Sequence, residues 1–198
     1  MDISIRLAKG EDADQIQAIY APFCAEESHV SFEVGEPSTE EIRSRIGRTL
    51  ERYPWLVCER SGEILGYVYA GAHSDRAAYL WSVTTAVYVG PECRRSGVGR
   101  ALYTSLFAVL RLQGFVNAYA GTVLPNPASV GLHRALGFEP VGVYGGVGYK
   151  GGQWLDAAWW QLSLQPRTKD PAPPSGIGSF RDTAAFDLAV ASGLRLLR

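Results

Sequence analysis

The spacing of hydrophobic and polar residues predicts a series of short strands and amphipathic helices. Apolar residues alternate with polar ones over residues 3–7, as in a half-buried strand. From Asp12 to Cys24 they recur at helical spacing, which predicts a helix. Ser38 and Glu41 then form a capping-box pattern, so we expect a second helix that ends near Arg52.

The chain up to residue 164 further predicts a hairpin, two strand–helix units and two final strands. Ser61-Gly62-Glu63 is a tight turn between two apolar runs, and Gly114 and Gly137 are placed to end helices. We expect strands over 55–59, 64–72, 78–89, 116–123, 138–148 and 154–164, and helices over 97–113 and 126–137. Because hairpins alternate with crossovers, the fold class should be α+β, or α/β with a mixed central sheet flanked by helices.

Composition changes after Leu164. Proline and glycine become frequent, so we interpret residues 166–182 as an extended linker. Beyond it, four apolar residues share one helical face: Phe186, Val190, Leu194 and Leu197. An isolated helix of this length is marginal in water, so we expect it to dock on the domain or on a partner subunit. The chain would then comprise a main domain (1–165), a linker (166–182) and a C-terminal amphipathic helix (183–198).

The overall composition excludes several classes of protein. The chain has 198 residues and a net charge of −1, so it carries no overall basic field to hold nucleic acid or an anionic membrane. Its three cysteines form no Cys-x-x-Cys pair and its three histidines are scattered, so we expect neither a disulfide framework nor a metal site. We find no signal peptide and no membrane-spanning run, and therefore expect a cytoplasmic protein.

The loop before the predicted helix 97–113 has the features of an anion site. Gly97 and Gly99 allow backbone N–H groups to approach a ligand, and the N-terminus of the helix adds partial positive charge. Three arginines add cations: Arg94, Arg95 and Arg100. A glycine-requiring turn with solvated arginines is the simpler alternative, but the strand–loop–helix setting favours a phosphate or pyrophosphate ligand. The loop lacks the Gly-Lys-Ser/Thr of a P-loop and the third glycine of a Rossmann fingerprint.

Motifs spread over residues 3–164 carry a family resemblance. They are Val30-Ser31-Phe32-Glu33, Tyr53-Pro54-Trp55-Leu56-Val57, Gly66-Tyr67-Val68-Tyr69-Ala70-Gly71, Ala78-Tyr79, Val87-Tyr88-Val89, Arg94-x-x-Gly97-x-Gly99, Leu124-Pro125-Asn126, Leu132-His133-x-x-Leu136-Gly137-Phe138 and Trp154-x-Asp156. The chain resembles the GNAT superfamily and, within it, the phosphinothricin and methionine sulfoximine N-acetyltransferases. The resemblance implies the GNAT acyl-CoA N-acyltransferase fold. It also implies direct transfer of acetyl from acetyl-CoA to the primary amine of a small amino-acid-like substrate.

The resemblance further assigns residues to acetyl-CoA. The backbone of residues 87–89 would pair with the pantetheine arm like an added strand, and the amides of residues 95–100 would hold the pyrophosphate. Asn126 would bond the cofactor amides, although its spacing alone fits a helix N-cap, and the two roles are compatible. The full set is Val87, Tyr88, Val89, Arg94, Arg95, Ser96, Gly97, Val98, Gly99, Arg100, Asn126, Ser129 and His133.

Two residues are candidates for catalysis. The resembling enzymes commonly place a glutamate three residues before the Val-Tyr-Val segment, and Thr84 occupies that position here. A threonine is a poor base and would at most order a water molecule. His133 is the next candidate, because the phosphinothricin-type enzymes have a histidine there and an imidazole titrates at about pH 6.5. From the sequence alone, a histidine on a helix face that packs against the sheet or solvent explains His133 better, and the resemblance reverses that preference.

Four residues are candidates for contact with the amine substrate. Phe32 and Glu33 match the family's substrate-side loop. Arg76 would hold a substrate carboxylate through a bidentate contact, or is an ordinary surface arginine. Tyr79 would line the pocket, or belongs to the core. We expect Lys150 to be a solvated turn residue.

Two other functions remain open at this point. The absence of a carboxylate at Thr84 allows a catalytically weak acyl-CoA-binding or sensor protein. The substrate could also be a protein N-terminus or lysine, which would require an open peptide groove. Thiol release from acetyl-CoA in the presence of candidate amines separates an enzyme from a sensor. Because many enzymes of the resembling family are dimers, we also expect a homodimer.

Overall fold

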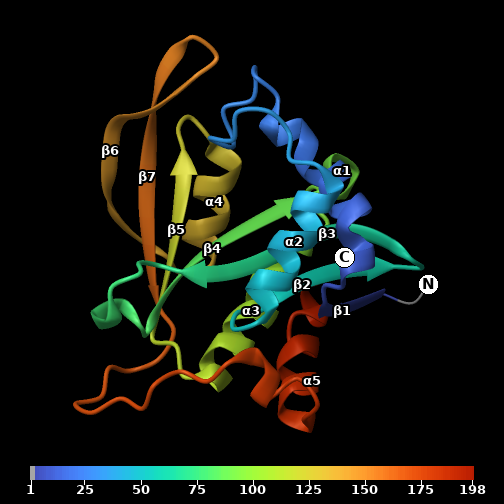
Figure 1. Ribbon diagram of the computed structural model, residues 1–198, viewed down its shortest axis with the longest axis vertical. Helices are drawn as coiled ribbons and strands as arrows, with labels where there is room; N and C mark the ends of the chain where they lie inside the picture. The colour runs from blue at the N-terminus through green and yellow to red at the C-terminus, as the bar shows by residue number, and fades with distance from the viewer. Residues whose placement is uncertain (1–2) are drawn as a thin grey trace.

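One seven-stranded mixed sheet organises the chain, with helices on both of its faces (Figure 1). The computed structural model describes residues 3–198. The strands are β1 (Ile3–Leu7), β2 (Trp55–Arg60), β3 (Glu63–Ala72), β4 (Ser82–Val89), β5 (Asn117–Val123), β6 (Glu139–Lys150) and β7 (Gln153–Ser163). The helices are α1 (Ala13–Cys24), α2 (Thr39–Leu50), α3 (Val98–Gln113), α4 (Pro127–Ala135) and α5 (Ala184–Ala191). The predicted mixed sheet flanked by helices is confirmed.

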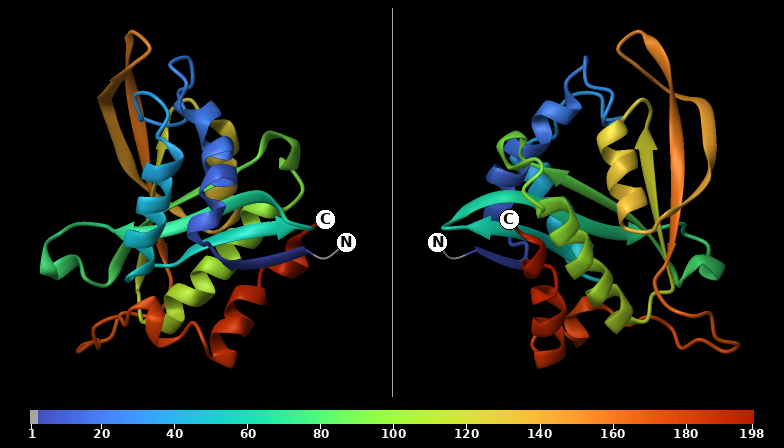
Figure 2. Two further views of the ribbon diagram at one scale, coloured as in Figure 1. Left: turned by 45° about the vertical axis from the view of Figure 1, so that its right-hand side comes forward. Right: turned by 180° about the vertical axis from the view of Figure 1, so that it is seen from behind.

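Two neighbouring strands in the middle of the sheet separate from each other. The strand order is β1-β2-β3-β4-β5-β7-β6, and β4 and β5 form the parallel pair while the other pairs are antiparallel. The parallel ladder has three pairs, from Ser82–Asn117 to Thr84–Tyr119. Beyond Thr84 the two strands diverge, although β3 stays paired with β4 as far as Val89 (Figures 1 and 2). We call this opening the fork, with Thr84 and Tyr119 at its apex.

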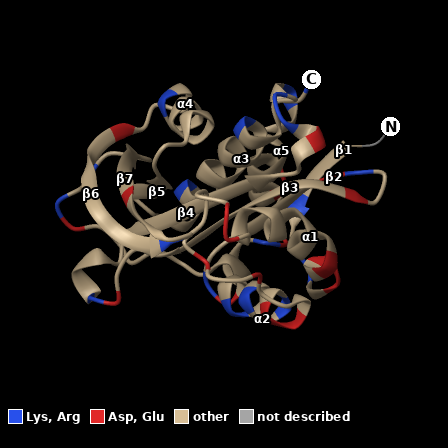
Figure 3. Cartoon of the chain, turned by 90° about the horizontal axis from the view of Figure 1, so that it is seen from above, with Lys and Arg blue, Asp and Glu red and all other residues tan. Residues whose placement is uncertain are grey.

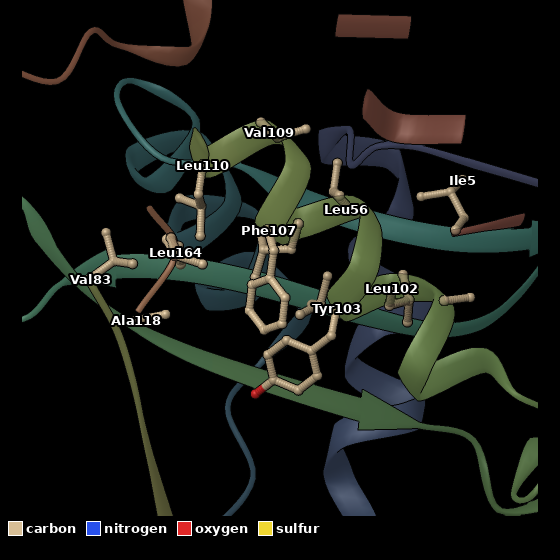
Figure 4. Packing of buried hydrophobic residues seen from close by; sticks show 14 of the residues in the cluster. Ile5, Leu56, Val83, Leu102, Tyr103, Phe107, Val109, Leu110, Ala118 and Leu164 are labelled. Carbon is tan, nitrogen blue, oxygen red and sulfur yellow. The ribbon is translucent and has the colours of Figure 1, made fainter. Parts of the chain in front are cut away.

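The two faces of the sheet are covered by different helices. α1 and α2 lie on one face, whereas α3, α4 and α5 lie on the other (Figure 3). Buried side chains on the α1–α2 face include Ile16, Ile42, Ile46, Trp55 and Tyr67. Those of the α3 face include Leu102, Tyr103, Leu106, Leu110 and Phe115 (Figure 4). Burial of one such side chain contributes about 1.5–3 kcal/mol, so packing on both faces fixes the position of the fork between them.

The predicted helix ends are present in the structure. The Ser38 hydroxyl oxygen accepts a 3.2 Å hydrogen bond from the backbone N–H of Glu41, as an N-cap of α2 should. α3 ends at Gly114, which has a φ of 94° and donates its N–H to the last carbonyls of the helix. Glycine accepts this left-handed conformation without the strain that a side chain would cause. These local signals set where α2 starts and where α3 stops.

β4 begins later than predicted. The sequence pattern favoured a strand from Ala78, but residues 77–79 form a 3-10 turn, and β4 starts at Ser82. The Tyr79 N–H donates to the Arg76 carbonyl in this turn, so these backbone groups are satisfied without a neighbouring strand. The aromatic content that suggested a strand here instead serves tertiary contacts: the Trp81 indole N–H donates to the carbonyl of Ala172 at 2.9 Å.

The segment after residue 164 packs against the body of the domain. Ser175 exchanges hydrogen bonds with Gln113 at the end of α3, and Ile177 is 1% exposed. Phe186 and Val190 of α5 are buried in the α3 core cluster. α5 ends at Ala191, and a 3-10 turn at Leu194–Leu196 follows. The apolar stripe thus docks on the domain itself, through a helix shorter than the predicted 183–198.

Candidate active site

The loop at the N-terminus of α3 presents free backbone donors. A short 3-10 turn at Pro91–Cys93 leads into residues 94–97, where Arg95 has a φ of 63° and Gly97 a φ of 90°. Within residues 3–198 no side chain caps the first turn of α3, and its first intrahelical bond is donated by Ala101 to the Gly97 carbonyl. The N–H groups of residues 98–100 therefore remain available to an anion, in the partial positive field of the helix N-terminus.

Gly97 lies against the C-terminal segment. A side chain at this position would collide with the carbonyl oxygen of Leu196, which belongs to the C-terminal 3-10 turn. The missing Cβ therefore makes room for the C-terminal segment. Gly99 is less constrained, because a Cβ there would meet Leu132 and Val89 side chains at ordinary contact distances of 3.4–3.6 Å. Ser96 closes the loop by donating its hydroxyl to the Cys93 carbonyl at 2.5 Å.

The fork exposes one edge of β4 beside this loop. β5 pairs with β4 only up to Thr84, so residues 85–89 have no strand partner on that side among the described residues. The side chain of Tyr88 points into the α1–α2 face, where its ring centroid lies 4.7 Å from that of Tyr20. The backbone N–H and C=O groups of this stretch that point away from β3 are then free to form an additional ladder with an extended ligand.

Asn126 and Ser129 lie at the N-terminus of α4. The side-chain oxygen of Asn126 accepts a 3.0 Å hydrogen bond from the Ser129 N–H, so Asn126 is the N-cap of α4. The NH₂ group of the same carboxamide has no partner within residues 3–198, and it can serve a ligand while the oxygen caps the helix. The Ser129 hydroxyl bonds Thr122 of β5 at 3.0 Å, which fixes α4 to the far side of the fork.

His133 is connected to the fork through a buried tyrosine. Its side chain is 3% exposed, its Nδ1–H donates to the Ser129 carbonyl at 2.8 Å, and Nε2 faces the Tyr103 hydroxyl at 3.3 Å. Tyr103 also reaches the hydroxyl of Thr85 at 3.4 Å, just past the apex of the fork. Burial lowers the pKa of His133, so the imidazole is neutral at pH 7. The hydrogen bonds of His133 thus reach the fork through Tyr103.

A second histidine lies at the apex on the opposite face. His73 follows β3, and its Nδ1 is 3.2 Å from the Thr84 hydroxyl oxygen. Its ring stacks on Tyr119, with centroids 4.3 Å apart and planes at 22°. Sequence reasoning missed His73 because it treated the histidines as scattered. The predicted hairpin joins residues 55–59 to 64–72 and carries no signal for His73, whereas the observed pairing of β3 with β4 places residue 73 diagonally opposite Thr84 on the same face.

The four substrate candidates form two separate pairs. Tyr79 lies beside His73, with ring centroids 5.5 Å apart, and Arg76 is exposed just before the same 3-10 turn. Phe32 instead packs against β6 at Gly148, and the Glu33 carboxylate accepts a 2.6 Å bond from Arg45 of α2. The contacts within residues 3–198 do not join the two pairs.

Lys150 was expected to be solvated, and this expectation was wrong. Its side chain is 5% exposed, and Nζ donates to the Ser31 carbonyl at 2.8 Å. The long lysine side chain therefore tethers the loop that carries Phe32 and Glu33 to the end of β6. The turn signal around Gly151 and Gly152 was correct, but tertiary packing buries the lysine that precedes them.

A cavity of about 220 Å³ lies between α1, α2 and the sheet. Tyr67 and Tyr69 of β3 line it, opposite Arg45 and Arg48 of α2. Burial raises the pKa of both tyrosines, so their hydroxyls stay protonated. Because Tyr69 pairs with Ala86 of β4, the aromatic wall of the cavity adjoins the strand that forms one arm of the fork. The cavity opens on the α1–α2 face, where the contact between His73 and Thr84 also lies.

Comparisons with known proteins agree with this geometry. Residues 5–159 match the acetyltransferase (GNAT) domain family. A phosphinothricin N-acetyltransferase of Streptomyces viridochromogenes is 40% identical over 149 residues, covering 75% of this chain and 79% of that protein. An L-methionine sulfoximine/L-methionine sulfone acetyltransferase of Pseudomonas paraeruginosa is 34% identical, covering 86% of this chain and 100% of that protein.

A solved structure extends the agreement to three dimensions. A GNAT superfamily phosphinothricin acetyltransferase from Sinorhizobium meliloti, in complex with AcCoA, superposes with a TM-score of 0.80 at 32% identity. The match covers 89% of this chain and 99% of that one. Within residues 3–198 no cluster of three His, Cys, Asp or Glu side chains suits a metal ion, and no helix is long and apolar enough to cross a membrane. The fold, the motifs and these relatives together show that the chain is an N-acetyltransferase of the GNAT family.

Proposed function

We propose that the protein transfers the acetyl group of acetyl-CoA directly to the primary amine of a small amino-acid-like substrate. The observation that carries this proposal is the continuity of two backbone sites. The free edge of β4 at residues 85–89 leads directly to the uncapped N-terminus of α3. An extended amide-containing arm ending in a pyrophosphate fits both, because it needs a strand partner followed by an anion site.

The cofactor site would be formed mainly by backbone groups. Val87, Tyr88 and Val89 would pair with the pantetheine amides, and the N–H groups from Arg95 to Arg100 would bond the pyrophosphate oxygens. The carboxamide NH₂ of Asn126 would bond the same arm from across the fork. The guanidinium groups in this loop would add charge that is screened at high salt.

The chemistry requires a neutral amine and a leaving thiolate. A thiol has a pKa of about 8.5, so the thiolate needs little assistance when it leaves. We assign that assistance to the Tyr103 hydroxyl, which lies at the fork beside Thr85 and is held by neutral His133. The Tyr103 proton would pass to the sulfur, and solvent would return a proton to Tyr103, while His133 Nε2 orients the hydroxyl. This role is that of a positioned acid, and its contribution should fall at the low end of the range of about 10²–10⁴ in rate that such groups supply.

The substrate is proposed to carry a carboxylate beside its amine. Relatives named for phosphinothricin and methionine sulfoximine act on amino acids of this kind, and one relative at 33% identity is named an L-amino acid N-acyltransferase (Escherichia coli). Arg76 is exposed beside Tyr79, on the side of the fork where His73 lies. A guanidinium there would bind the carboxylate in a bidentate manner and orient the amine.

The decisive experiment is a thiol-release screen with acetyl-CoA. The amines are methionine sulfoximine, phosphinothricin, ordinary amino acids, polyamines and a peptide with a free N-terminus. Turnover of the amino-acid analogues, with weak turnover of polyamines and peptide, is the expected result. Tight CoA binding without turnover of any amine would favour a sensor, and a preference for the peptide would favour a protein acetyltransferase.

We also propose that the protein is a homodimer. Apolar side chains are exposed on the β6–β7 hairpin: Val141, Val143, Tyr144, Val147, Tyr149 and Trp154. Trp154 is 68% exposed, which is unusual for so large an apolar side chain, and β6 is an edge strand of the sheet. Light scattering during gel filtration should give twice the monomer mass of 21.5 kDa, and a shift to monomer in a Trp154→Glu variant would locate the interface.

A further inference from the structure

We propose that His73 is the general base that accepts the proton of the attacking amine, a role that rests on the proposed acetyl transfer. The family's expected carboxylate is absent, because Thr84 takes its position. The structure places the imidazole of His73 against that same threonine, with Nδ1 3.2 Å from Oγ1. The imidazole of His73, at the end of the neighbouring strand β3, therefore places a titratable group next to Thr84.

The position of His73 coincides with the apex of the fork. Its two close partners, Thr84 and Tyr119, form the last pair of the parallel ladder before the strands separate. A cofactor arm that pairs with residues 87–89 runs toward this apex, so its reacting end would arrive there. His73 lies on the α1–α2 face, whereas Tyr103 and His133 lie on the α3 face. His73, the proposed base, and Tyr103 with His133, the proposed acid, thus lie on opposite sides of the fork. This arrangement suits an acid and a base that serve the same reaction.

Three aromatic rings and one hydroxyl hold the imidazole in place. Tyr119 stacks on it, Tyr79 lies 5.5 Å away and Trp159 6.1 Å away between ring centroids. Among the contacts described for residues 3–198, none from these elements brings a carboxylate or a cation to the ring. Burial alone lowers the pKa of His73, so the ring is neutral at pH 7 and able to accept a proton.

The hydrogen bond to Thr84 selects the reactive nitrogen. When Nδ1–H donates to the threonine oxygen, Nε2 keeps its lone pair. Nε2 has no hydrogen-bond partner within residues 3–198 and is not among the buried unpaired atoms, so it faces accessible space. Thr84 is then a positioning residue for His73, in place of acting as a base itself.

The transfer moves one proton from the amine to His73 and one proton to the leaving sulfur. The amine nitrogen forms a bond to the thioester carbonyl carbon, and one N–H proton of the amine passes to Nε2 of His73. The carbon–sulfur bond breaks, and the thiolate takes a proton from Tyr103 or solvent. His73 then loses its proton to solvent, which restores the neutral ring. The reaction needs no oxidant, reductant or additional co-reactant.

The test compares His73→Gln with the wild type in the thiol-release assay. Glutamine approximates the size of the imidazole and can still donate to Thr84, but it cannot accept a proton at neutral pH. We expect kcat to fall by about 10²-fold or more, with the KM for acetyl-CoA unchanged, as for loss of a general base. The acid limb of the kcat–pH profile below about pH 6.5 should disappear with it.

Two further variants separate chemistry from structure. Imidazole added to His73→Ala should restore part of the lost rate, which a merely structural role would not allow. Thr84→Val removes the hydroxyl while keeping the shape, and should lower kcat less than His73→Gln does. His29→Gln is the matched control, because His29 bonds Gln153 near the end of the β6–β7 hairpin and should retain wild-type kcat.

The outcomes distinguish this inference from the proposed function. If wild-type protein releases thiol with an amine and His73→Gln, folded and binding acetyl-CoA normally, stays within threefold of its kcat, His73 is not the base and the proposed function stands. If wild-type protein binds acetyl-CoA but turns over none of the amines, the proposed function fails and the general-base role fails with it. Loss of kcat in His73→Gln together with imidazole rescue of His73→Ala supports the inference.

Discussion

The backbone N–H of Arg198 donates a 3.0 Å hydrogen bond to the carbonyl oxygen of Ser96, in the loop before α3. The C-terminal segment is anchored along α3 as well. Ser105 of α3 donates its hydroxyl to the Val190 carbonyl at 2.6 Å and accepts the Gly193 N–H at 3.2 Å. The segment beyond the matched family domain therefore braces the loop proposed to bind pyrophosphate.

Deleting residues 194–198 should weaken acetyl-CoA binding. The deletion removes the Arg198–Ser96 hydrogen bond and the packing of Leu196 on Gly97, so the loop gains freedom that the cofactor must remove on binding. We expect the KM for acetyl-CoA to rise by about 5- to 20-fold, equivalent to about 1–2 kcal/mol, while kcat changes little. Steady-state kinetics and calorimetry of CoA binding measure both quantities.

Arg198→Ala provides the matched control for this deletion. The contact with Ser96 comes from the backbone, so loss of the Arg198 side chain should leave the KM for acetyl-CoA near the wild-type value. An equal rise in KM for Arg198→Ala and for the deletion would mean that the side-chain charge, and not the brace, supports binding. An unchanged KM for acetyl-CoA in the deletion variant would show that the C-terminal segment does not support cofactor binding.

Asn126 combines two roles that different substitutions can separate. Asn126→Ala loses the cap on α4, which should cost about 1 kcal/mol of stability, and also loses the NH₂ group proposed to bond the cofactor. Asn126→Asp keeps an oxygen for the Ser129 N–H but has no donor. Thermal unfolding should therefore distinguish the two variants, whereas the KM for acetyl-CoA should rise in both. If Asn126→Asp retains the wild-type KM, Asn126 is only a helix cap.

Local signals made much of the fold predictable from the sequence. The Ser38 cap, the Gly114 stop and the Asn126-Pro127 start all act within one turn of a helix, so their effect is readable without tertiary information. The free edge of β4 was expected only through the resemblance to GNAT enzymes. Strand divergence depends on side chains of both layers, which no local pattern contains.

The missed features are long-range contacts. The contact of His73 with Thr84 depends on the register in which β3 pairs with β4. The Lys150–Ser31 hydrogen bond joins residues 119 positions apart. The start of β4 was misplaced because the aromatic residues near Ala78 resemble a strand, whereas Trp81 is used to hold the carbonyl of Ala172. In each case tertiary packing overrides an ambiguous local preference.

Arg76 should determine recognition of the substrate carboxylate. Arg76→Ala removes the proposed bidentate contact, so the KM for an amino-acid substrate should rise by about 10-fold or more, while the KM for acetyl-CoA stays constant. The corresponding amino-acid amide lacks the carboxylate and should show the same KM with wild type and Arg76→Ala. A similar loss for acid and amide would show that Arg76 supports the 3-10 turn instead of the substrate.

His133 and Tyr103 should act as one unit in catalysis. His133→Ala should lower kcat by well over tenfold, because Tyr103 loses the partner that holds its hydroxyl at the fork. Tyr103→Phe removes that hydroxyl directly and should lower kcat by a similar factor. The double variant should be little worse than either single one, since residues acting as a unit are non-additive. If the loss of kcat in the double variant equals the product of the two single losses, the residues do not share one role.

The buried state of His133 should also appear in the pH dependence of stability. Burial lowers its pKa in the folded protein, whereas an unfolded histidine titrates at about 6.5. Below that pH the unfolded chain binds a proton that the folded chain does not, so the free energy of unfolding falls as the pH drops. One such group contributes a slope of at most about 1.4 kcal/mol per pH unit, and His73, whose pKa burial also lowers, adds a slope of the same sign.

Urea unfolding at pH 5, 6 and 7 measures this effect. The free energy of unfolding should depend less steeply on pH for His133→Gln than for the wild type. Equal slopes would mean that His133 takes up its proton in the folded protein as readily as in the unfolded chain.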